Sequence, residues 1–250
     1  MEQGLHVGET GLKEATGAVS SDHRVALNDV VGFRPHAQVP YIIGGRSLHL
    51  DPSITAIART SRLSEILIRL LDIVGSLVIL TCALPIMFVA AVLIKATSKG
   101  PVFYRQERVG RGGRMFVLCK FRTMIDDAEK HIGPVWAARD DDRITPVGRV
   151  LRRMRLDELP QLFNILKGDM SLVGPRPERP FFVERHKALQ GVRLAVKPGL
   201  TGLAQVRSFY DLKPAHKVKY DYLYIQNRSF LLNLYILLQT IPILFGKKGW

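Results

Sequence analysis

The apolar positions of the chain are concentrated in one long run, from residue 73 to residue 94, that contains no charged side chain. These 22 residues match the roughly 20 that a helix needs to cross a membrane, so the pattern predicts a membrane-inserted helix. Upstream, apolar residues recur at helical spacing from Ile54 to Leu71, directly after the helix-start sequence Asp51-Pro52-Ser53. We therefore expect a helix that begins near residue 54 and continues into the membrane segment.

Pro85 divides the apolar run and removes one backbone hydrogen bond, which predicts a kinked helix. The two arms, residues 73–84 and 86–94, rise only about 18 and 13 Å, and each is too short to cross a membrane. Basic residues precede and follow the run, and basic flanks stay in the cytoplasm. Two topologies are consistent with this pattern: a bent helix that enters and leaves by the same face, and a single kinked span with the N-terminal tail outside.

The regions on either side of this helix show weaker patterns. Residues 1–50 have no sustained apolar period and predict a mobile tail with one short strand at Val39–Ile43. The N-terminus lacks the basic and apolar regions of a signal peptide, so we expect no cleavage there. After residue 100, two apolar runs, Val102–Arg105 and Met115–Phe121, flank a basic, glycine-rich segment at 109–114 and predict a β-hairpin.

The second half of the chain is predicted to be mainly helical. Helices are expected at Asp126–His131, Val147–Arg155, Leu156–Lys167, Lys213–Gln226 and Phe230–Phe245. Gly168 is expected to end the third of these. The last is short for a membrane span and is interrupted by polar residues, which indicates an amphipathic helix at the membrane interface. Residues 171–207 are rich in proline and glycine and predict ordered loops, so the expected fold is a helix-rich α+β fold.

Charge changes the picture more than any other global property. The chain carries 36 Lys and Arg against 22 Asp and Glu, a net charge of +14, and the first 60 residues contribute none of this excess. Such a basic body favours anionic partners: nucleic acid, anionic lipid or a phosphorylated substrate. With 47% hydrophobic residues the chain is not a disordered one. Its two cysteines, Cys82 and Cys119, exclude a disulfide scaffold and a four-cysteine zinc site.

The strongest candidate for chemistry is the pair Asp157-Glu158, which follows a cluster of arginines at 152–155. The simplest interpretation is structural: Asp157 caps a helix and Glu158 lies at its positive end. A functional interpretation is also open. Adjacent side chains on a helix point about 100° apart, so one carboxylate can hold a metal while its neighbour stays free. Arginine is suited to bidentate phosphate contacts. The familiar motifs HExxH, GxSxG, GxGxxG and the Walker loop are absent.

Two further segments carry candidate phosphate-binding residues. Arg176 lies between Pro175 and Pro177 on a stiff backbone, which forms either a rigid turn with an exposed arginine or a guanidinium oriented toward a phosphate or a uracil edge. Lys120 lies at the end of a predicted strand, where a lysine is usually solvated, so by itself it indicates little.

Taken together, four segments resemble the signature segments of the bacterial sugar transferases, the monotopic phosphoglycosyl transferases that begin polysaccharide and glycoprotein-glycan assembly. They are Lys120–Met124, Leu156–Gln161, Gly168–Glu178 and Pro198–Val206. The resemblance covers about residues 60–245 and implies a reentrant membrane helix. It divides the chain into a tail (1–55), the membrane helix (56–97) and a catalytic domain on the cytoplasmic face with a C-terminal interfacial helix (98–250).

The resemblance also implies an activity. Members of the family transfer a sugar phosphate from a UDP-sugar to polyprenyl (undecaprenyl) phosphate, release UMP, use Mg²⁺, and form a covalent aspartyl-phosphosugar intermediate. By position in the motif, Asp157 matches the nucleophile and Glu158 the metal-binding carboxylate. The positions that match phosphate- or nucleotide-binding segments are Lys120, Arg152, Pro175, Arg176, Pro177 and Arg207.

The partners implied by the resemblance are a UDP-sugar donor, a polyprenyl phosphate acceptor and anionic lipids of the bacterial inner membrane, with the catalytic domain facing the cytoplasm. A homo-oligomer and complexes with downstream glycosyltransferases are also compatible with it, whereas nucleic acid is not expected. Two other classes compete with this one: a membrane-tethered nucleic-acid-binding module that stacks bases on Tyr104, Phe116 and Phe121, and an inactive scaffold. Release of UMP separates the three.

Overall fold

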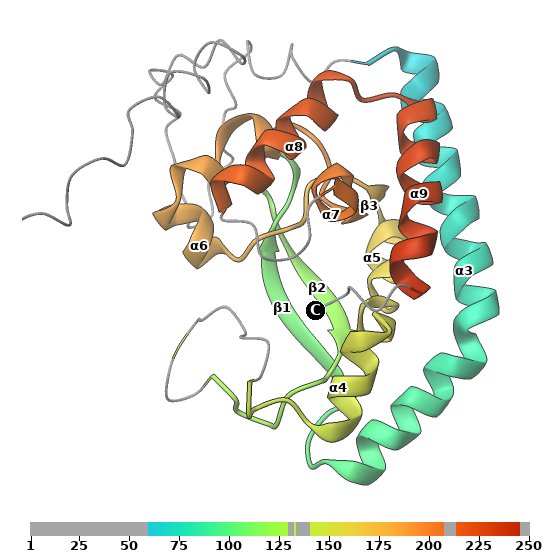
Figure 1. Cartoon of the computed structure of the whole chain (residues 1–250), viewed down its shortest axis with the longest axis vertical. Helices are drawn as coiled ribbons and strands as arrows, with labels where there is room; N and C mark the ends of the chain where they lie inside the picture. The colour runs from blue at the N-terminus through green and yellow to red at the C-terminus, as the bar shows by residue number, and fades with distance from the viewer. Residues whose placement is uncertain (1–59, 130–132, 134–140, 208–213, 246–250) are drawn as a thin grey trace, which may run out of the picture. The chain divides into compact units, whose positions relative to one another are not determined.

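The computed structural model describes residues 60–129, 133, 141–207 and 214–245 of the chain (Figure 1). Its helices are α3 (Arg62–Thr97), α4 (Pro146–Arg153), α5 (Gln161–Lys167), α6 (Pro180–Arg185), α7 (Leu203–Arg207), α8 (Pro214–Gln226) and α9 (Phe230–Phe245). Its strands are β1 (Phe103–Val109), β2 (Met115–Phe121), β3 (Ser171–Val173) and β4 (Gly199–Thr201). The predicted helix-rich α+β fold is confirmed. The predicted tail (1–55), its strand and the helix start at Asp51 lie outside the described residues.

Helix α3 is the long apolar helix that the sequence predicts, and it is long and apolar enough to cross a membrane. It begins at Arg62, because Ser61 is extended and its hydroxyl accepts a hydrogen bond from the Ser64 amide at 3.2 Å. The prediction of an unbroken helix from residue 54 is therefore wrong at residues 60 and 61, which are not helical. The helix continues through Pro85, and in Figure 1 its axis changes direction in its lower half.

One stripe along α3 is buried against the rest of the protein. The stripe consists of Ile68, Asp72, Ser76, Leu80, Ala83, Met87, Ala90 and Ile94. Its spacing of three and four residues keeps these side chains on one face of the helix. From Leu80 onward the stripe belongs to the main hydrophobic core, together with residues of β2 and α5. The opposite face is exposed, so α3 is also one wall of the folded domain.

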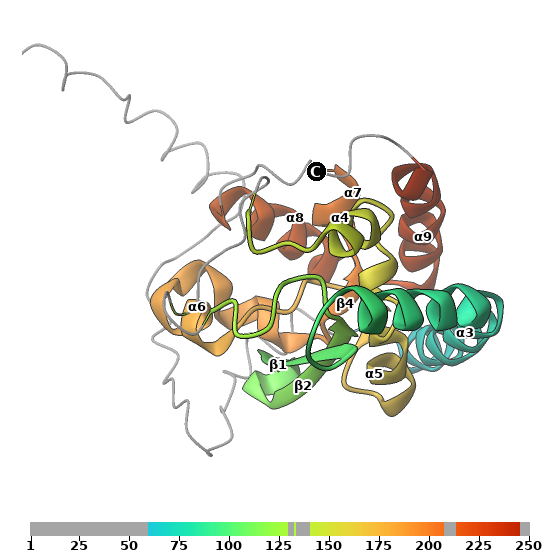
Figure 2. The same cartoon turned by 90° about the horizontal axis from the view of Figure 1, so that it is seen from below.

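Strands β1 and β2 form the predicted antiparallel hairpin, in which Tyr104 faces Lys120 across the ladder. Strand β1 extends beyond the predicted run Val102–Arg105 and ends at Val109. In its second half exposed and inward-facing side chains still alternate, but the inward-facing ones at 106 and 108 are polar. Helix α5 lies between the hairpin and α3 (Figures 1 and 2). The predicted helix at Asp126–His131 is not formed where the structure describes it, since residues 126–129 make turns.

The segment from 146 to 168 departs from the prediction in one respect. Instead of two adjoining helices, α4 ends at Arg153, a 3₁₀ turn (η2) covers Leu156–Glu158, and α5 starts at Gln161. Arg155 has φ +55°, and this left-handed residue reverses the chain between α4 and the turn. Pro160 precedes α5 as its cap residue, which delays the start of that helix. Gly168 ends α5 in a left-handed conformation, as predicted.

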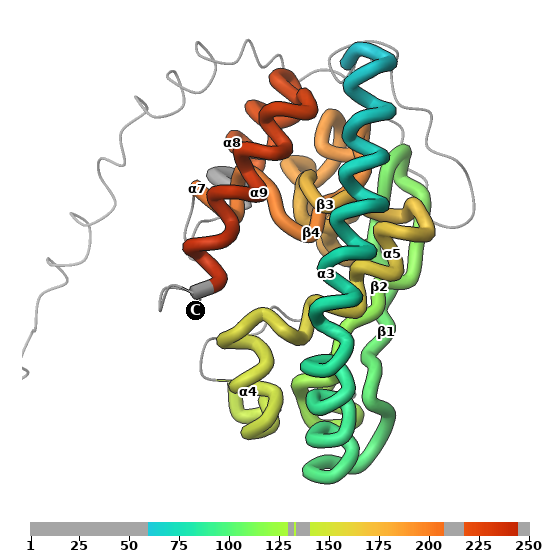
Figure 3. Tube along the Cα trace, turned by 90° about the vertical axis from the view of Figure 1, so that its right-hand side faces the viewer, coloured from blue at the N-terminus to red at the C-terminus, as the bar shows by residue number. Residues whose placement is uncertain are grey.

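Residues 171–207 contain more regular structure than the predicted loops. Strands β3 and β4 pair in parallel, and Gly174 directly follows β3. A Cβ atom at Gly174 would lie 2.5 Å from the Lys197 carbonyl oxygen, so only glycine fits there. Helices α8 and α9 follow as predicted, and α9 lies beside α3 (Figures 1 and 3). The Phe230 amide at the start of α9 donates to the Ser64 hydroxyl on α3 at 3.1 Å.

Candidate active site

Asp157 and Glu158 lie on the η2 turn between α4 and α5. Asp157 is buried, and the Glu158 side chain is 14% exposed. The structural interpretation of Asp157 as the cap of an α-helix is wrong, because the following helix begins only at Gln161 with Pro160 at its cap position. Two adjacent carboxylates, both largely withdrawn from water, require compensating charge.

Three of the predicted cations supply that charge. Arg176 binds Glu158 through the two terminal nitrogens of its guanidinium group. One donates to Oε1 at 2.6 Å and the other to Oε2 at 3.3 Å, which is the bidentate geometry that arginine favours. Arg152 is buried, and its Nε donates to the Thr123 hydroxyl at 2.8 Å, which fixes its orientation. Lys120 lies near both carboxylates, and its ammonium group is 5.2 Å from the centre of the Tyr104 ring. The structure thus brings together residues that β2, α4, η2 and the segment after β3 contribute.

The electrostatic environment shifts three of these groups. Burial and the neighbouring charge of Glu158 raise the pKa of Asp157 to about 6, against the effect of the nearby cations. Burial alone would raise the pKa of Glu158, but the charge and hydrogen bonds of Arg176 hold that pKa below its ordinary value. Burial lowers the pKa of Lys120 to about 8, although the charge of Asp157 acts in the opposite direction. Such opposed shifts within one cluster are typical of functional sites.

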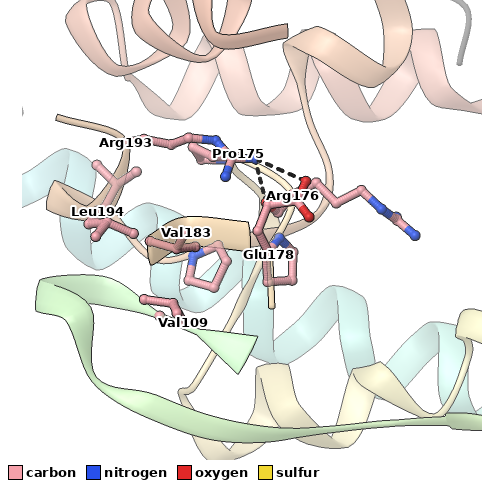
Figure 4. A pocket seen from close by; sticks show the side chains of 11 residues that line it. Val109, Pro175, Arg176, Glu178, Val183, Arg193 and Leu194 are labelled. Carbon is pink, nitrogen blue, oxygen red and sulfur yellow. Dashed lines mark hydrogen bonds and ion pairs between the residues drawn. The ribbon is translucent and has the colours of Figure 1, made fainter. Parts of the chain in front are cut away.

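The Pro-Arg-Pro segment is held by its backbone. The carbonyl of Pro175 accepts from the Gly199 amide at 2.9 Å, that of Arg176 from Arg193 at 2.5 Å, and that of Pro177 from Arg108 at 3.0 Å. A small pocket lies beneath the segment, and Figure 4 shows the Arg176 side chain pointing away from it. Because three consecutive carbonyls are fixed, the Arg176 guanidinium is presented to Glu158 by a rigid backbone.

Sequence reasoning missed the two arginines that hold this segment. Arg108 belongs to a row of inward side chains on β1, in which Arg108 donates to Gln106 at 2.6 Å and Gln106 to the Tyr104 hydroxyl at 2.9 Å. The alternation of polar residues at 104, 106 and 108 is the signal that could have identified it. Arg193 forms a buried ion pair with Asp221 at 2.7 Å, and no local pattern connects residues 28 positions apart.

Arg207 is the last of the predicted binding residues along the chain. It is exposed at the end of α7, and it donates to the Tyr235 hydroxyl on α9 at 3.1 Å. This hydrogen bond joins the guanidinium to α9, and within the described residues no hydrogen bond or ion pair joins it to Asp157 or Glu158. Its assignment as a phosphate-binding residue therefore stays a prediction.

Comparison with known proteins connects this geometry to a family. Residues 63–247 match the family described as bacterial sugar transferase. The chain is 43% identical over 187 residues to the UDP-N-acetylgalactosamine-undecaprenyl-phosphate N-acetylgalactosaminephosphotransferase of Aeromonas hydrophila, a match that covers 72% of this chain and 44% of the relative. It is 43% identical over 183 residues to the UDP-glucose:undecaprenyl-phosphate glucose-1-phosphate transferase of Klebsiella pneumoniae, covering 69% of this chain and 39% of the relative.

A third relative is matched over most of its length. The chain is 41% identical over 186 residues to the UDP-glucose:undecaprenyl-phosphate glucose-1-phosphate transferase of Caulobacter vibrioides, covering 70% of this chain and 68% of the relative. The chain thus spans less than half the length of the Aeromonas and Klebsiella proteins, and about two thirds of the Caulobacter protein. In this chain, the region that matches the family contains the carboxylate cluster and all of α3 after its first residue.

Proposed function

Because the chain belongs to the bacterial sugar transferase family, we propose that it is a phosphoglycosyl transferase that moves a sugar phosphate from a UDP-sugar to undecaprenyl phosphate and releases UMP. This reaction would begin the assembly of a bacterial glycan such as an exopolysaccharide. The observation that carries the proposal is the largely buried Asp157-Glu158 pair with Lys120, Arg152 and Arg176 around it. The names of the relatives include two different sugars, so the proposal does not specify one.

Asp157 is the nucleophile in this proposal. One of its carboxylate oxygens forms a bond to the β-phosphorus of the UDP-sugar, while the bond from that phosphorus to the bridging oxygen breaks and its electron pair leaves with UMP. A phosphate oxygen of undecaprenyl phosphate then attacks the same phosphorus, and the bond to Asp157 breaks, which restores the carboxylate. With a pKa of about 6 the carboxylate is ionised at neutral pH, and covalent catalysis by aspartate requires that form.

The surrounding residues offset the repulsion between the carboxylate and the diphosphate. Lys120 and Arg152 lie close enough to Asp157 to affect its pKa, and the same charges would stabilise the phosphate oxygens in the transition state. Arg176 is presented by a rigid backbone and offers a planar guanidinium, which binds phosphate well. These contacts support a diphosphate-binding role for all three cations.

We propose that Mg²⁺ is the metal cofactor and that Glu158 holds the ion, while Asp157 stays free to act as the nucleophile. Mg²⁺ typically takes one or two carboxylates and completes its shell with substrate phosphates and water, so a single carboxylate is a sufficient protein ligand. Within the described part of the chain, no group of three or more His, Cys, Asp or Glu side chains is placed to hold a metal, so an all-protein cage is not proposed. When bound, Mg²⁺ would neutralise negative charge on the diphosphate.

The acceptor is a lipid, and the exposed apolar faces of α3 and α9 support a location at the membrane. On α9, Leu231, Leu238 and Ile241 are exposed, and this helix lies beside α3. We propose that α3 is reentrant and that α9 lies at the interface of the inner membrane, with the catalytic cluster on the cytoplasmic side. Pro85 within the helix and the basic residues on both flanks support this topology, because anionic lipids attract such flanks.

The experiment that tests the function measures UMP release from a panel of UDP-sugars with undecaprenyl phosphate in detergent. We expect Asp157→Asn to abolish turnover, because the amide is nearly isosteric but not nucleophilic. Asp142→Asn, at an exposed aspartate, is the matched control and should retain full activity. A phosphosugar adduct should be trapped on residue 157 when the acceptor is omitted. Normal turnover in Asp157→Asn, or no UMP release with any donor, would contradict the proposal.

The topology is tested by labelling single cysteines in a variant that lacks Cys82 and Cys119. A single cysteine replaces either Ser21 or Lys99, and cells with a permeabilised outer membrane are treated with an impermeant thiol reagent. A reentrant helix predicts that neither position reacts until the inner membrane is opened. Labelling of position 21 alone would show that α3 spans the membrane. Pro85→Leu restores a straight apolar helix of about 33 Å, which matches the hydrocarbon thickness and should convert the reentrant form into a span.

A further inference from the structure

Asp72 is a carboxylate in an unusual place, at the last position before the uncharged run of α3. Its side chain is 2% exposed. Its Oδ1 atom accepts two hydrogen bonds from β3, one from the Leu172 amide at 2.8 Å and one from the Ser171 hydroxyl at 2.9 Å. A buried carboxylate is costly to retain, and both of its partners belong to β3, so we read Asp72 as the residue that attaches the membrane helix to that strand.

The approach of the two elements is close at this point. A Cβ atom on Gly75 would lie 2.8 Å from the Leu172 side chain, so α3 and β3 meet with little free space between them. One turn before Asp72, Arg69 donates to the carbonyls of Ile165 and Leu166 at the end of α5, both at 2.8 Å. In this part of α3, two side chains of opposite charge therefore hold the helix to the domain: Arg69 binds the end of α5, and Asp72 binds β3.

From Leu172 the backbone leads directly to Arg176, and it is fixed at almost every step. The Val173 carbonyl lies 3.0 Å from the Tyr224 hydroxyl, the Gly174 amide donates to Thr201 at 2.9 Å, and the Pro175 carbonyl accepts from Gly199. A displacement of Leu172 is then transmitted to Arg176, because the hydrogen-bonded residues between them leave little room to absorb it.

We propose that Asp72 is a positioning residue for the transfer reaction: it fixes the depth of the membrane helix relative to β3 and thereby places the Arg176 guanidinium against Glu158. This inference rests on the proposed function, because it assigns the effect to binding of the UDP-sugar. The proposal links the position of α3 against β3 to the position of Arg176 in the site that binds the UDP-sugar. A protein in which α3 is displaced should therefore bind the UDP-sugar weakly.

The test compares Asp72→Leu with Asp72→Asn in purified full-length protein, using UMP release at varied concentrations of both substrates. Asp72→Leu leaves the Leu172 amide and the Ser171 hydroxyl without their acceptor, and we expect the KM for the UDP-sugar to rise at least about tenfold. The KM for undecaprenyl phosphate should stay unchanged. Asparagine retains the Oδ1 acceptor, so Asp72→Asn should keep the donor KM within about threefold of the parent value.

A merely structural role predicts a different pattern. Partial unfolding lowers the active fraction and therefore kcat, while both KM values stay the same. That result, or a donor KM in Asp72→Leu equal to that of the parent protein, would overturn the proposal. A third observable does not depend on activity: hydrogen exchange at the Leu172 amide should accelerate in Asp72→Leu and not in Asp72→Asn.

Gly75→Phe provides a second perturbation in case Asp72→Leu does not accumulate in the membrane. A lone Cβ atom at this position would lie 2.8 Å from the end of the Leu172 side chain, a contact that rotation of that side chain relieves. A phenyl ring is too large for that rotation to accommodate and should separate α3 from β3 without removing a hydrogen-bonding group, so we expect the same selective rise in donor KM. Leu77→Ala, on the exposed face of the same helix, is the matched control and should change neither KM. If the parent protein releases no UMP, the proposed function has failed, and the Leu172 exchange rates then decide whether the attachment of α3 to β3 exists.

Discussion

The pH dependence of the reaction offers the most direct test of the carboxylate cluster. The nucleophile must be ionised, so activity should be lost as the pH falls through the pKa of Asp157, which is about 6. The ionised fraction then drops to about one tenth at pH 5, and kcat/KM should fall by the same factor. Lys120 acts as a cation and must be protonated, so activity should also be lost as the pH rises through its pKa of about 8. A bell-shaped profile with a maximum near pH 7 follows.

Two variants move the acid limb of this profile in opposite directions. Lys120→Met removes a cation that lowers the pKa of Asp157, so the acid limb should move to higher pH and the alkaline limb should disappear. Glu158→Gln removes the neighbouring anion that raises the pKa of Asp157, so the acid limb should move to lower pH. The direction of each shift follows from the sign of the charge removed.

The assay is UMP release at donor concentrations well below KM, between pH 4.5 and 9.5, where kcat/KM reports the free enzyme. Residual activity of each variant suffices, because the position of the limb rather than its height is compared. Asp142→Asn is the control, and its profile should match the parent profile. An acid limb near pH 4, the ordinary range for aspartate, would refute the reasoning, as would shifts of both variants in the same direction.

Three further predictions concern the metal, the buried ion pair between Arg193 and Asp221, and the hydrophobic core. A chelator should stop UMP release, and Glu158→Gln should raise the Mg²⁺ concentration needed for half-maximal activity; full activity in chelator would exclude a metal. Arg193→Met removes the cation from buried Asp221 and should destabilise the fold by about 3–5 kcal/mol, measured as a lower melting temperature in detergent. Met87→Ala should cost about 2–5 kcal/mol in the same assay, whereas Phe88→Ala, at a side chain 72% exposed, should leave the melting temperature unchanged.

Local patterns in the sequence determined much of this protein. The uncharged run of α3, the two apolar strands of the hairpin and the interval Phe230–Phe245 each identify an element, because periodicity and hydrophobic length act on neighbouring residues. The sequence also directed attention to Asp157 and Glu158, since a carboxylate pair after an arginine cluster is chemically unusual. The resemblance to the sugar transferases, carried by four short segments, is confirmed by the family match.

Element boundaries were less well determined by local pattern. The sequence predicts a helix from 156 to 167, but Pro160 and the left-handed Arg155 divide this stretch into a 3₁₀ turn and a shorter helix. The inward row on β1 was missed because its side chains are polar and serve the site rather than the core. The helix boundary is set by these two residues, and the inward row of β1 is recognised only from its hydrogen bonds.

Only the tertiary structure decided which distant residues act together. Asp72 meets Leu172, Arg193 meets Asp221, and Arg176 meets Glu158, and none of these pairs follows from spacing along the chain. Each contact depends on how α3, the two small sheets and α8 pack together. The strength of a buried hydrogen bond or ion pair comes from the exclusion of water by that packing, and this exclusion exists only once the chain has folded.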